Sequence, residues 1–282
     1  MLTIQTNVAA LYGEQNLNVN HTFQQTTIER LTSGYRINSA ADDAAGLAIA
    51  NGLRSERTEL SQGIQNANNA VSQLQIIDGG LSNISQILDR LKTLAVQGAS
   101  STFTGSAATL VNEMKNDVAE INRQAGNIGL GNGSTQNVAT LSIYIGGGLG
   151  NNNAQIGSAT ESVDLSGGKV DQTGLVLGSV AALTTGATAG DFQVVIASIA
   201  AAVGALGAVQ GTVGAGINQL NFAVGLAQSQ VTNYAADESG IRDADMATEA
   251  SNLSKSQVLV QSSIAAMAQA NQIPQAVLKL LQ

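Results

Sequence analysis

The sequence predicts a mainly α-helical protein, with long antiparallel coiled-coil helices from both chain ends and a small β-hairpin region in the middle. Two long segments repeat apolar residues at steps of three and four, which is the period of one helix face. Pro274 is the single proline in 282 residues, so almost nothing interrupts a helix. Between residues 141 and 145, apolar and polar residues alternate as they do in a strand.

Each long segment carries one apolar stripe. At about 1.5 Å per residue, the stripes imply rods roughly 45–65 Å long, and neither stripe can bury its seam alone. Gly79 and Gly80 interrupt the first stripe, so tertiary packing must offset roughly 0.5–1 kcal/mol for each. The first stripe contains Ile64, Ala67, Val71, Leu74, Ile77, Leu81, Ile84, Leu88, Leu91 and Ala95, and the second contains Phe192, Val195, Ile199, Ala202, Leu206, Val209, Val213, Ile217, Leu220, Val224, Ala227, Val231 and Tyr234.

Two shorter elements lie between these stripes. A third helix is expected where Leu110, Met114, Val118, Ile121 and Ala125 share one face. Residues 129–190 carry only four charges and are rich in Gly, Asn, Ser and Thr. Leu141, Ile143 and Ile145 begin a predicted hairpin, residues 146–153 form its turn or loop, and residues 156–165 contain the return strand.

The two chain ends are weaker helices without a complete partner. Residues 1–29 hold only two charged side chains, Glu14 and Glu29, among Asn, Gln and Thr. We expect these ends to become ordered when another surface completes their burial. The last forty residues place Met246, Ala250, Leu253, Val260, Ile264 and Met267 on one helical face.

Composition argues against several classes of protein. A net charge of −8 with scattered basic residues disfavours nucleic acid as a partner. There is no cysteine, and His21 is the single histidine, so we expect no metal site, no cofactor and no catalytic constellation. The acids between residues 237 and 245 lack the spacing of a calcium loop and indicate a solvated helix start. The chain is predicted not to be an enzyme.

An uncharged run at residues 194–216 raises the alternative of a membrane-anchored coiled-coil protein. The run lacks flanking Lys or Arg and an aromatic belt, and its stripe continues in phase through Asn218 and Gln219. We therefore expect no membrane insertion. The first basic residue is Arg30, so a secretory signal peptide is not evident and export is expected by another route.

Motifs at both ends resemble those of bacterial flagellins. RLTSGYRINSAADDAAG at residues 30–46, continuing as LAIAN to residue 51, is similar to the N-terminal signature, and LKTLAVQ at residues 91–97 is similar to a second patch. IRDADMATE at residues 241–249 and ANQIPQ at residues 270–275 resemble the C-terminal signature. Both sets occur in order at opposite ends of the chain, which makes the resemblance specific.

The resemblance implies a subunit that polymerises with itself into the extracellular flagellar filament for swimming, its terminal helices folding upon assembly. It also implies three parts: residues 1–40 with 240–282 as an inner terminal-helix domain, 41–128 with 190–239 as a helical rod, and 129–189 as a hairpin and loop region with little or no outer domain. The implied partners are the flagellar export apparatus, an export chaperone, and the hook-associated and cap proteins. A hook–filament junction protein remains an alternative.

The Ser39-x-x-Asp42 pattern fits a helix N-cap.

Two groups of candidate contact residues follow from the resemblance. Recognition by the innate-immune Toll-like receptor 5 is implied for Arg90, Leu94 and Glu113, although Thr93 replaces an acidic residue common in that patch. The candidates for contact between subunits are Arg30, Arg36, Asp42, Asp43, Leu278 and Leu281.

Overall fold

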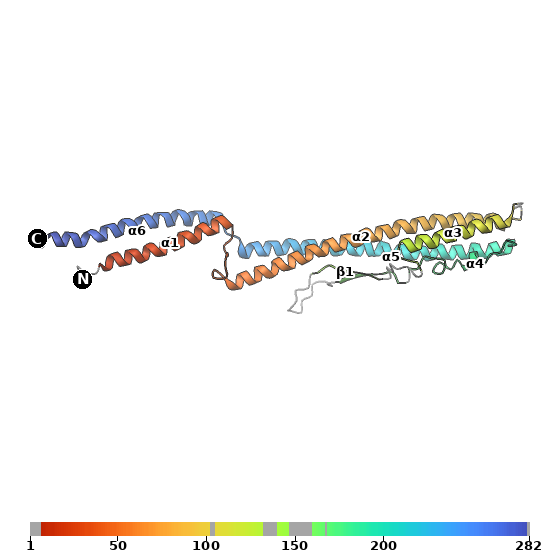
Figure 1. Cartoon of the computed structure of the whole chain (residues 1–282), viewed down its shortest axis with the longest axis horizontal. Coiled ribbons are helices and arrows are strands. Elements are labelled where there is room, and N and C mark those ends of the chain that lie inside the picture. Colours follow the sequence, from red (N-terminus) through yellow and green to blue (C-terminus); the bar gives the residue numbers. More distant parts are fainter. Residues whose placement is uncertain (1–6, 102–104, 132–139, 147–159, 167, 281–282) are drawn as a thin grey trace. The chain divides into compact units, whose positions relative to one another are not determined.

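The computed structural model describes residues 7–101, 105–131, 140–146, 160–166 and 168–280, and side chains up to residue 272 (Figure 1). The chain divides into two compact units. The terminal unit comprises Met1–Ser55 with Asn233–Gln282, and the middle unit comprises Glu56–Thr232. In order, the elements are α1 (Val8–Ser33), α2 (Ala44–Ala99), α3 (Ala107–Asn127), β1 (Thr140–Tyr144), β2 (Thr160–Asp164), α4 (Gly178–Ala182), α5 (Ala189–Arg242) and α6 (Met246–Leu280).

This architecture confirms the mainly α-helical fold with long helices from both ends and a small central hairpin. Strands β1 and β2 pair antiparallel, with Thr140 opposite Asp164 and Tyr144 opposite Thr160. The hairpin connection predicted at residues 147–153 and the start of the return strand at 156–159 lie outside the described residues. The short helix α4 was not predicted, because five residues are too few to show a helical period.

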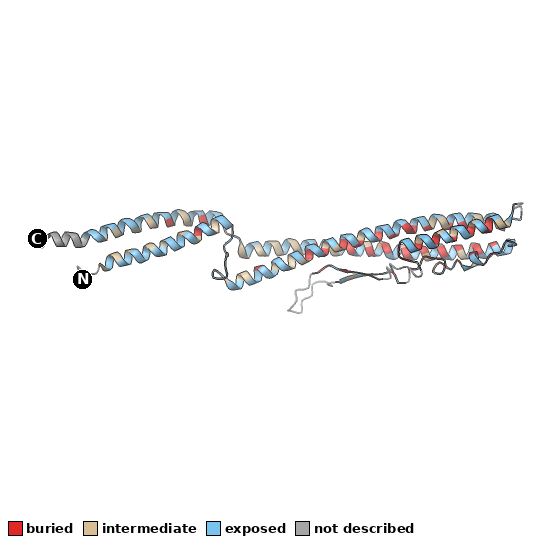
Figure 2. Cartoon of the chain, in the orientation of Figure 1, coloured by how far each residue is buried: buried red, intermediate tan, exposed pale blue. Residues whose placement is uncertain are grey.

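The apolar core belongs to the middle unit. The predicted stripes are its buried faces on α2, α3 and α5, whereas α1 and α6 are exposed or half-buried almost throughout (Figure 2). The largest fully buried side chains of the middle unit are Phe192, Leu60, Leu74, Leu81, Ile84, Leu88, Leu91, Met114, Ile121, Leu175 and Leu177.

Three glycines on α2 give other elements room to approach the helix. A Cβ at Gly63 would lie 1.7 Å from the Ile145 carbonyl oxygen, which follows β1. At Gly80 it would lie 2.3 Å from Ile128 Cγ2, and at Gly98 it would lie 2.6 Å from the Phe192 ring at the start of α5. Tertiary packing therefore accounts for Gly80, as the sequence suggested. Gly79 beside it faces open space.

The hairpin is held between α2 and α5. Asn66 Nδ2 donates a hydrogen bond of 3.1 Å to the Tyr144 carbonyl, and the Tyr144 hydroxyl donates to Glu59. On the opposite side Val163 packs so closely over Gly216 that a Cβ there would lie 2.6 Å from it. The absence of a side chain at Gly63 and Gly216 thus fixes where the hairpin lies.

Helix α5 is, among the described residues, the one helix that is long and apolar enough to cross a membrane. A core helix of a globular protein also meets these criteria of length and apolar composition. Ten residues of α5, including Phe192, Ile199 and Leu220, are buried in the chain itself. The core of the middle unit thus accounts for these ten positions of α5.

Two glycines of α2 test whether the hairpin needs this close approach. We expect Gly63→Ala to lower the free energy of unfolding by about 1–3 kcal/mol, because the new Cβ meets backbone that cannot move freely. Gly79→Ala is the matched control and is expected to gain about 0.5–1 kcal/mol, since its Cβ enters open space on the same helix. Urea unfolding followed by circular dichroism measures both, and equal effects would contradict the packing described.

Candidate assembly surface

Helices α1 and α6 pair along a seam that combines polar contacts with small and half-buried apolar residues. Asn7 Nδ2 donates to the Ala270 carbonyl at 2.9 Å, and Asn20 Nδ2 donates to Ser263 Oγ at 3.0 Å. Gly13 lies against Met267, since a Cβ added at Gly13 would lie 3.4 Å from the Met267 Cβ. Such hydrogen bonds fix an antiparallel register, but each adds only about 0.5–1.5 kcal/mol net.

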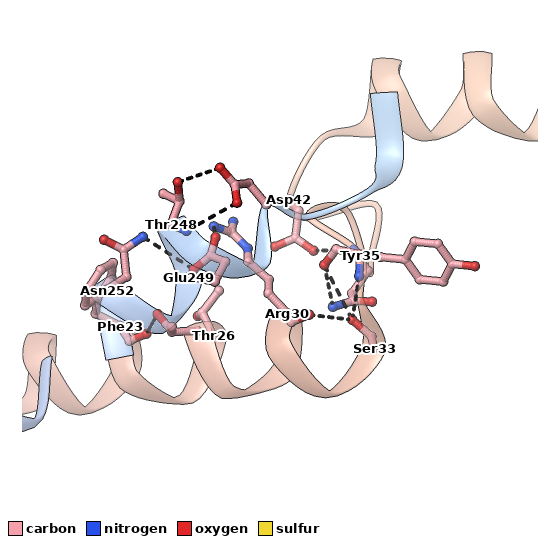
Figure 3. A network of polar contacts seen from close by, with 12 residues as sticks. Phe23, Thr26, Arg30, Ser33, Tyr35, Asp42, Thr248, Glu249 and Asn252 are labelled. Carbon is pink, nitrogen blue, oxygen red and sulfur yellow. Dashed lines mark hydrogen bonds and ion pairs between the residues drawn. The ribbon is translucent and has the colours of Figure 1, made fainter. Parts of the chain in front are cut away.

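An ion pair closes the seam where α6 begins. Arg30 of α1 and Glu249 of α6 lie side by side (Figure 3), with Arg30 Nη1 3.4 Å from Glu249 Oε1. The Glu249 side chain is only 9% exposed. Asn252 Nδ2 donates to the other Glu249 oxygen at 3.4 Å. A buried carboxylate without a cation is costly, so this pair specifies the register more strongly than the neutral bonds.

The chain segments next to the ion pair are bound to one another through their backbones. Gly34 ends α1 in the left-handed conformation at φ 76°, which L side chains rarely adopt. The Arg36 amide donates to the Arg242 carbonyl at 2.7 Å, and the Ala244 amide donates to the Gly34 carbonyl at 2.9 Å. The Arg242 guanidinium lies 4.2 Å from the centroid of the Tyr35 ring, a cation–π contact.

The charged residues proposed for contact between subunits all have partners within their own chain. Arg30 pairs with Glu249, as described above, and Arg36 Nη2 donates to the Ile241 carbonyl at 2.7 Å. Asp42 accepts from the Ser39 amide at 2.9 Å, and these local hydrogen bonds lower the pKa of Asp42. The side chain of Leu278 and the whole of Leu281 lie outside the described part of the chain.

The expectation that Ser39 caps a helix is wrong. The amide of Asp42 donates to the Ser39 carbonyl at 3.1 Å, so residues 39–42 close a turn of their own. Helix α2 begins after this turn, at Ala44. Its first amides are capped by Asp43, whose Oδ1 accepts from the Gly46 amide at 2.9 Å.

The start of α6 is capped in the same way. Asp245 accepts from the Ala247 amide at 2.9 Å and from the Thr248 hydroxyl at 2.8 Å. These hydrogen bonds, the Thr248 side chain first, lower the pKa of Asp245. The resulting stabilisation is present above the ordinary Asp pKa and is lost as the pH falls through the lowered value.

Large apolar side chains of α1 and α6 lie on the outside of the pair. Among the described side chains of both helices, only Thr27, Glu249 and Ser256 are buried, and none is a large hydrophobic residue. Tyr12 is 64% exposed. The predicted apolar face of α6 is only in part its seam with α1: Leu253, Val260 and Met267 are half-buried, and Met267 lies against Gly13, whereas Met246, Ala250 and Ile264 are exposed. The exposed large side chains are Val8, Leu11, Tyr12, Val19, Phe23 and Ile28 on α1, and Met246, Val258, Leu259 and Ile264 on α6.

The expected receptor patch lies on α2 and α3 of the middle unit. The structure brings Arg90 and Glu113 together as an ion pair and places half-buried Leu94 one turn along α2. Arg90 Nε also lies 3.4 Å from Asp117 Oδ2. Sequence reasoning missed Asp117, although its position one turn after Glu113 on the same helix was a usable signal. The hydrogen bond to Glu113 raises the pKa of Arg90, while burial raises that of Asp117.

Comparisons with known proteins agree with this arrangement. A family model of the bacterial flagellin N-terminal helical region matches residues 4–134, and a model of the C-terminal helical region matches residues 196–281. The chain is 33% identical over 286 residues to a flagellin of Halalkalibacterium halodurans, across 99% of this chain and 100% of that protein. It is 31% identical over 294 residues to the flagellar filament 33 kDa core protein of Treponema phagedenis, and 32% identical over 304 residues to a flagellin of Bacillus subtilis; each match covers 99% of this chain and 100% of the relative.

Long paired helices from both ends, together with these similarities, define a structural subunit of a protein filament. The chain belongs to the bacterial flagellin family. It is a subunit that polymerises with copies of itself into the flagellar filament used for motility. The resemblance drawn from the terminal motifs is thereby confirmed, and neither the junction protein nor the membrane-anchored coiled coil is favoured.

The Arg30–Glu249 pair can be tested by a double-mutant cycle in assembled filaments. We expect Arg30→Met to lower the heat-dissociation midpoint of the filament, because it leaves the Glu249 carboxylate buried without its cation, a cost of about 1–3 kcal/mol. Arg30→Met with Glu249→Leu should recover most of that loss, since both charges are then absent. If the loss in the double variant equals the sum of the losses from Arg30→Met alone and Glu249→Leu alone, the two side chains act independently.

Proposed function

We propose that the α1–α6 pair is the element that drives polymerisation, and that its exposed apolar faces are covered by the same faces of other copies. The observation that carries this proposal is the distribution of side chains: among the described side chains of the pair no large apolar one is fully buried, while Tyr12, Phe23 and Ile264 are exposed. Burying one such side chain contributes about 1.5–3 kcal/mol. A pair with so little internal burial gains most of its stability from neighbouring subunits.

Order in the terminal helices is then coupled to assembly. In its described part, the isolated pair has hydrogen bonds such as those of Asn7 and Asn20, together with the Arg30–Glu249 ion pair, to offset the conformational entropy of two long helices. Each added subunit covers apolar surface on its neighbours, and contacts of this head-to-tail kind extend without closing into a ring. The filament therefore grows above the concentration at which the free energy gained by this burial exceeds the free-energy cost of ordering the terminal helices.

Substitutions on the outer face of α1 test the proposal. We expect Tyr12→Ser with Phe23→Ser to raise the critical concentration for polymerisation at least tenfold, because at least 1.4 kcal/mol of intersubunit burial is lost. Asn18→Ser with Gln25→Ser is the matched control, since these exposed side chains are polar already. Sedimentation and negative-stain microscopy measure assembly, and normal filaments from the Tyr12/Phe23 variant would refute the proposal.

The remaining partners follow from the same exposed surface and from the family. The chain acts outside the cell after passage through the flagellar export apparatus, with an export chaperone covering the apolar faces beforehand. Hook-associated and cap proteins lie at the two ends of the filament.

The chain has no catalytic role. Leu278 and Leu281 contribute to contact between subunits. Arg36 also contributes, through the part of its side chain that the hydrogen bond to the Ile241 carbonyl leaves exposed.

Toll-like receptor 5 is proposed to recognise Arg90, Leu94 and Glu113. The ion pair between Arg90 and Glu113 supports this, because it holds two exposed charged side chains from α2 and α3 in one fixed arrangement. Asp117 belongs to the same cluster and fixes the guanidinium from a second direction. A fixed charge array loses little conformational entropy on binding.

A further inference from the structure

Two glutamates of α2 lie one helical turn apart beside the end of the hairpin strand β1. Glu59 accepts a hydrogen bond from the hydroxyl of Tyr144, the last residue of β1, and a Cβ at Gly146 would lie 3.0 Å from Glu59 Cγ. Glu56 precedes Glu59 by three residues, so the two side chains share one face of the helix. The contact between α2 and the end of β1 therefore includes a pair of carboxylates.

The Glu56 carboxylate is half-buried without a partner that stabilises its charge. Its Oε2 atom is buried and accepts no hydrogen bond from the described residues. Burial, and after it repulsion by Glu59, raises the pKa of Glu56. The hydrogen bond to Glu59, then the Glu59 charge and burial, and last the charge of Glu56 raise the pKa of Tyr144. The three groups thus lie within electrostatic range of one another.

The elements packed around this pair bring acidic or neutral side chains toward it. Helix α5 lies beside α2 here, because both helices line one groove (Figure 1), and no charged residue occurs between residues 192 and 236. The hairpin adds a further acid to the same groove, Glu161 on β2. On α2 itself, Arg54 and Arg57 lie about 200° and about 100° from Glu56 around the helix axis. Ionised Glu56 therefore meets a second carboxylate on its own face of α2.

We infer that Glu56, Glu59 and Tyr144 form a proton-sensitive clamp, which holds the hairpin to α2 more firmly in mildly acidic than in neutral solution. When Glu56 binds a proton, one of two like charges disappears and its half-buried carboxyl no longer needs a cation. Glu59 then keeps its hydrogen bond from Tyr144 without a repelling neighbour. When Glu56 loses the proton, the repulsion opposes the contact that Glu59 makes with the hairpin.

The sign of the pH dependence follows from the raised pKa of Glu56. The folded state binds this proton more tightly than the unfolded chain does. The stabilisation is therefore complete below the ordinary Glu pKa and is lost as the pH rises through the raised value. The cap of α6 behaves in the opposite way, because the pKa of Asp245 is lowered. Acid thus strengthens the hairpin contact in the middle unit while it weakens the start of α6 in the terminal unit.

Hydrogen exchange of the hairpin amides in the dilute monomer tests the clamp. The protection factors of the β1 and β2 amides in the parent should be at least about twofold higher at pH 5 than at pH 8. Glu56→Gln keeps the shape of the side chain without its charge, so it should remove this difference and protect the hairpin at pH 8 as well as the parent does at pH 5. Asp89→Asn is the matched control, because it removes an exposed carboxylate from the same helix and should leave the parent's pH profile unchanged.

A titration of the parent keeps the clamp testable where Glu56→Gln does not fold. Carbon-13 NMR of the glutamate carboxyl groups, assigned through their bonds to the backbone, should show Glu56 titrating above the ordinary Glu range. The inference would be overturned by a Glu56 that titrates in the ordinary range, or by the same pH profile of hairpin protection in the parent and in Glu56→Gln. Both measurements use the monomer, so their failure would leave the assembly role of the terminal pair untouched.

Discussion

The constraint on which the whole structure depends is that the α1–α6 pair, over its described side chains, fully buries no large apolar one. Its seam combines amide, hydroxyl and carboxylate contacts, from Asn7 at one end to Glu249 at the other, with half-buried apolar side chains such as Met267. Those contacts select one antiparallel register but supply little free energy. Large apolar side chains such as Tyr12 and Ile264 face outward, and we propose that another copy covers them in the homopolymer.

The middle unit differs from the terminal pair, because it forms an apolar core within a single chain. Three helices contribute continuous apolar faces, and glycines such as Gly63 and Gly98 allow a hairpin and an aromatic ring to approach the backbone of α2. A subunit with a stable middle unit and with exposed apolar side chains on its terminal helices can remain monomeric before assembly. We propose that the same subunit gains order as its ends meet those of its neighbours.

Much of this could be predicted from the sequence, since helical period depends only on spacing. The stripe from Ala67 to Ala95 is the buried face of α2, and Ile143 lies on a real strand. The seam of α6 was predicted only in part: apolar periodicity identified Leu253, Val260 and Met267, which are half-buried, but also Met246 and Ile264, which are exposed. Partners such as Glu249 for Arg30 were also missed: residues far apart in sequence come together only through the register of the fold.

Amide hydrogen exchange, compared between monomer and filament, tests most directly whether the terminal pair obtains its stability from other subunits. Amides of α1 and α6 should exchange rapidly in the monomer and slow by orders of magnitude in the filament, while the buried stretches of α2, α3 and α5 stay protected in both. Equally slow exchange of α1 and α6 in a dilute monomer would show that the pair is stable alone. Outward-facing apolar residues would then have no role in ordering it.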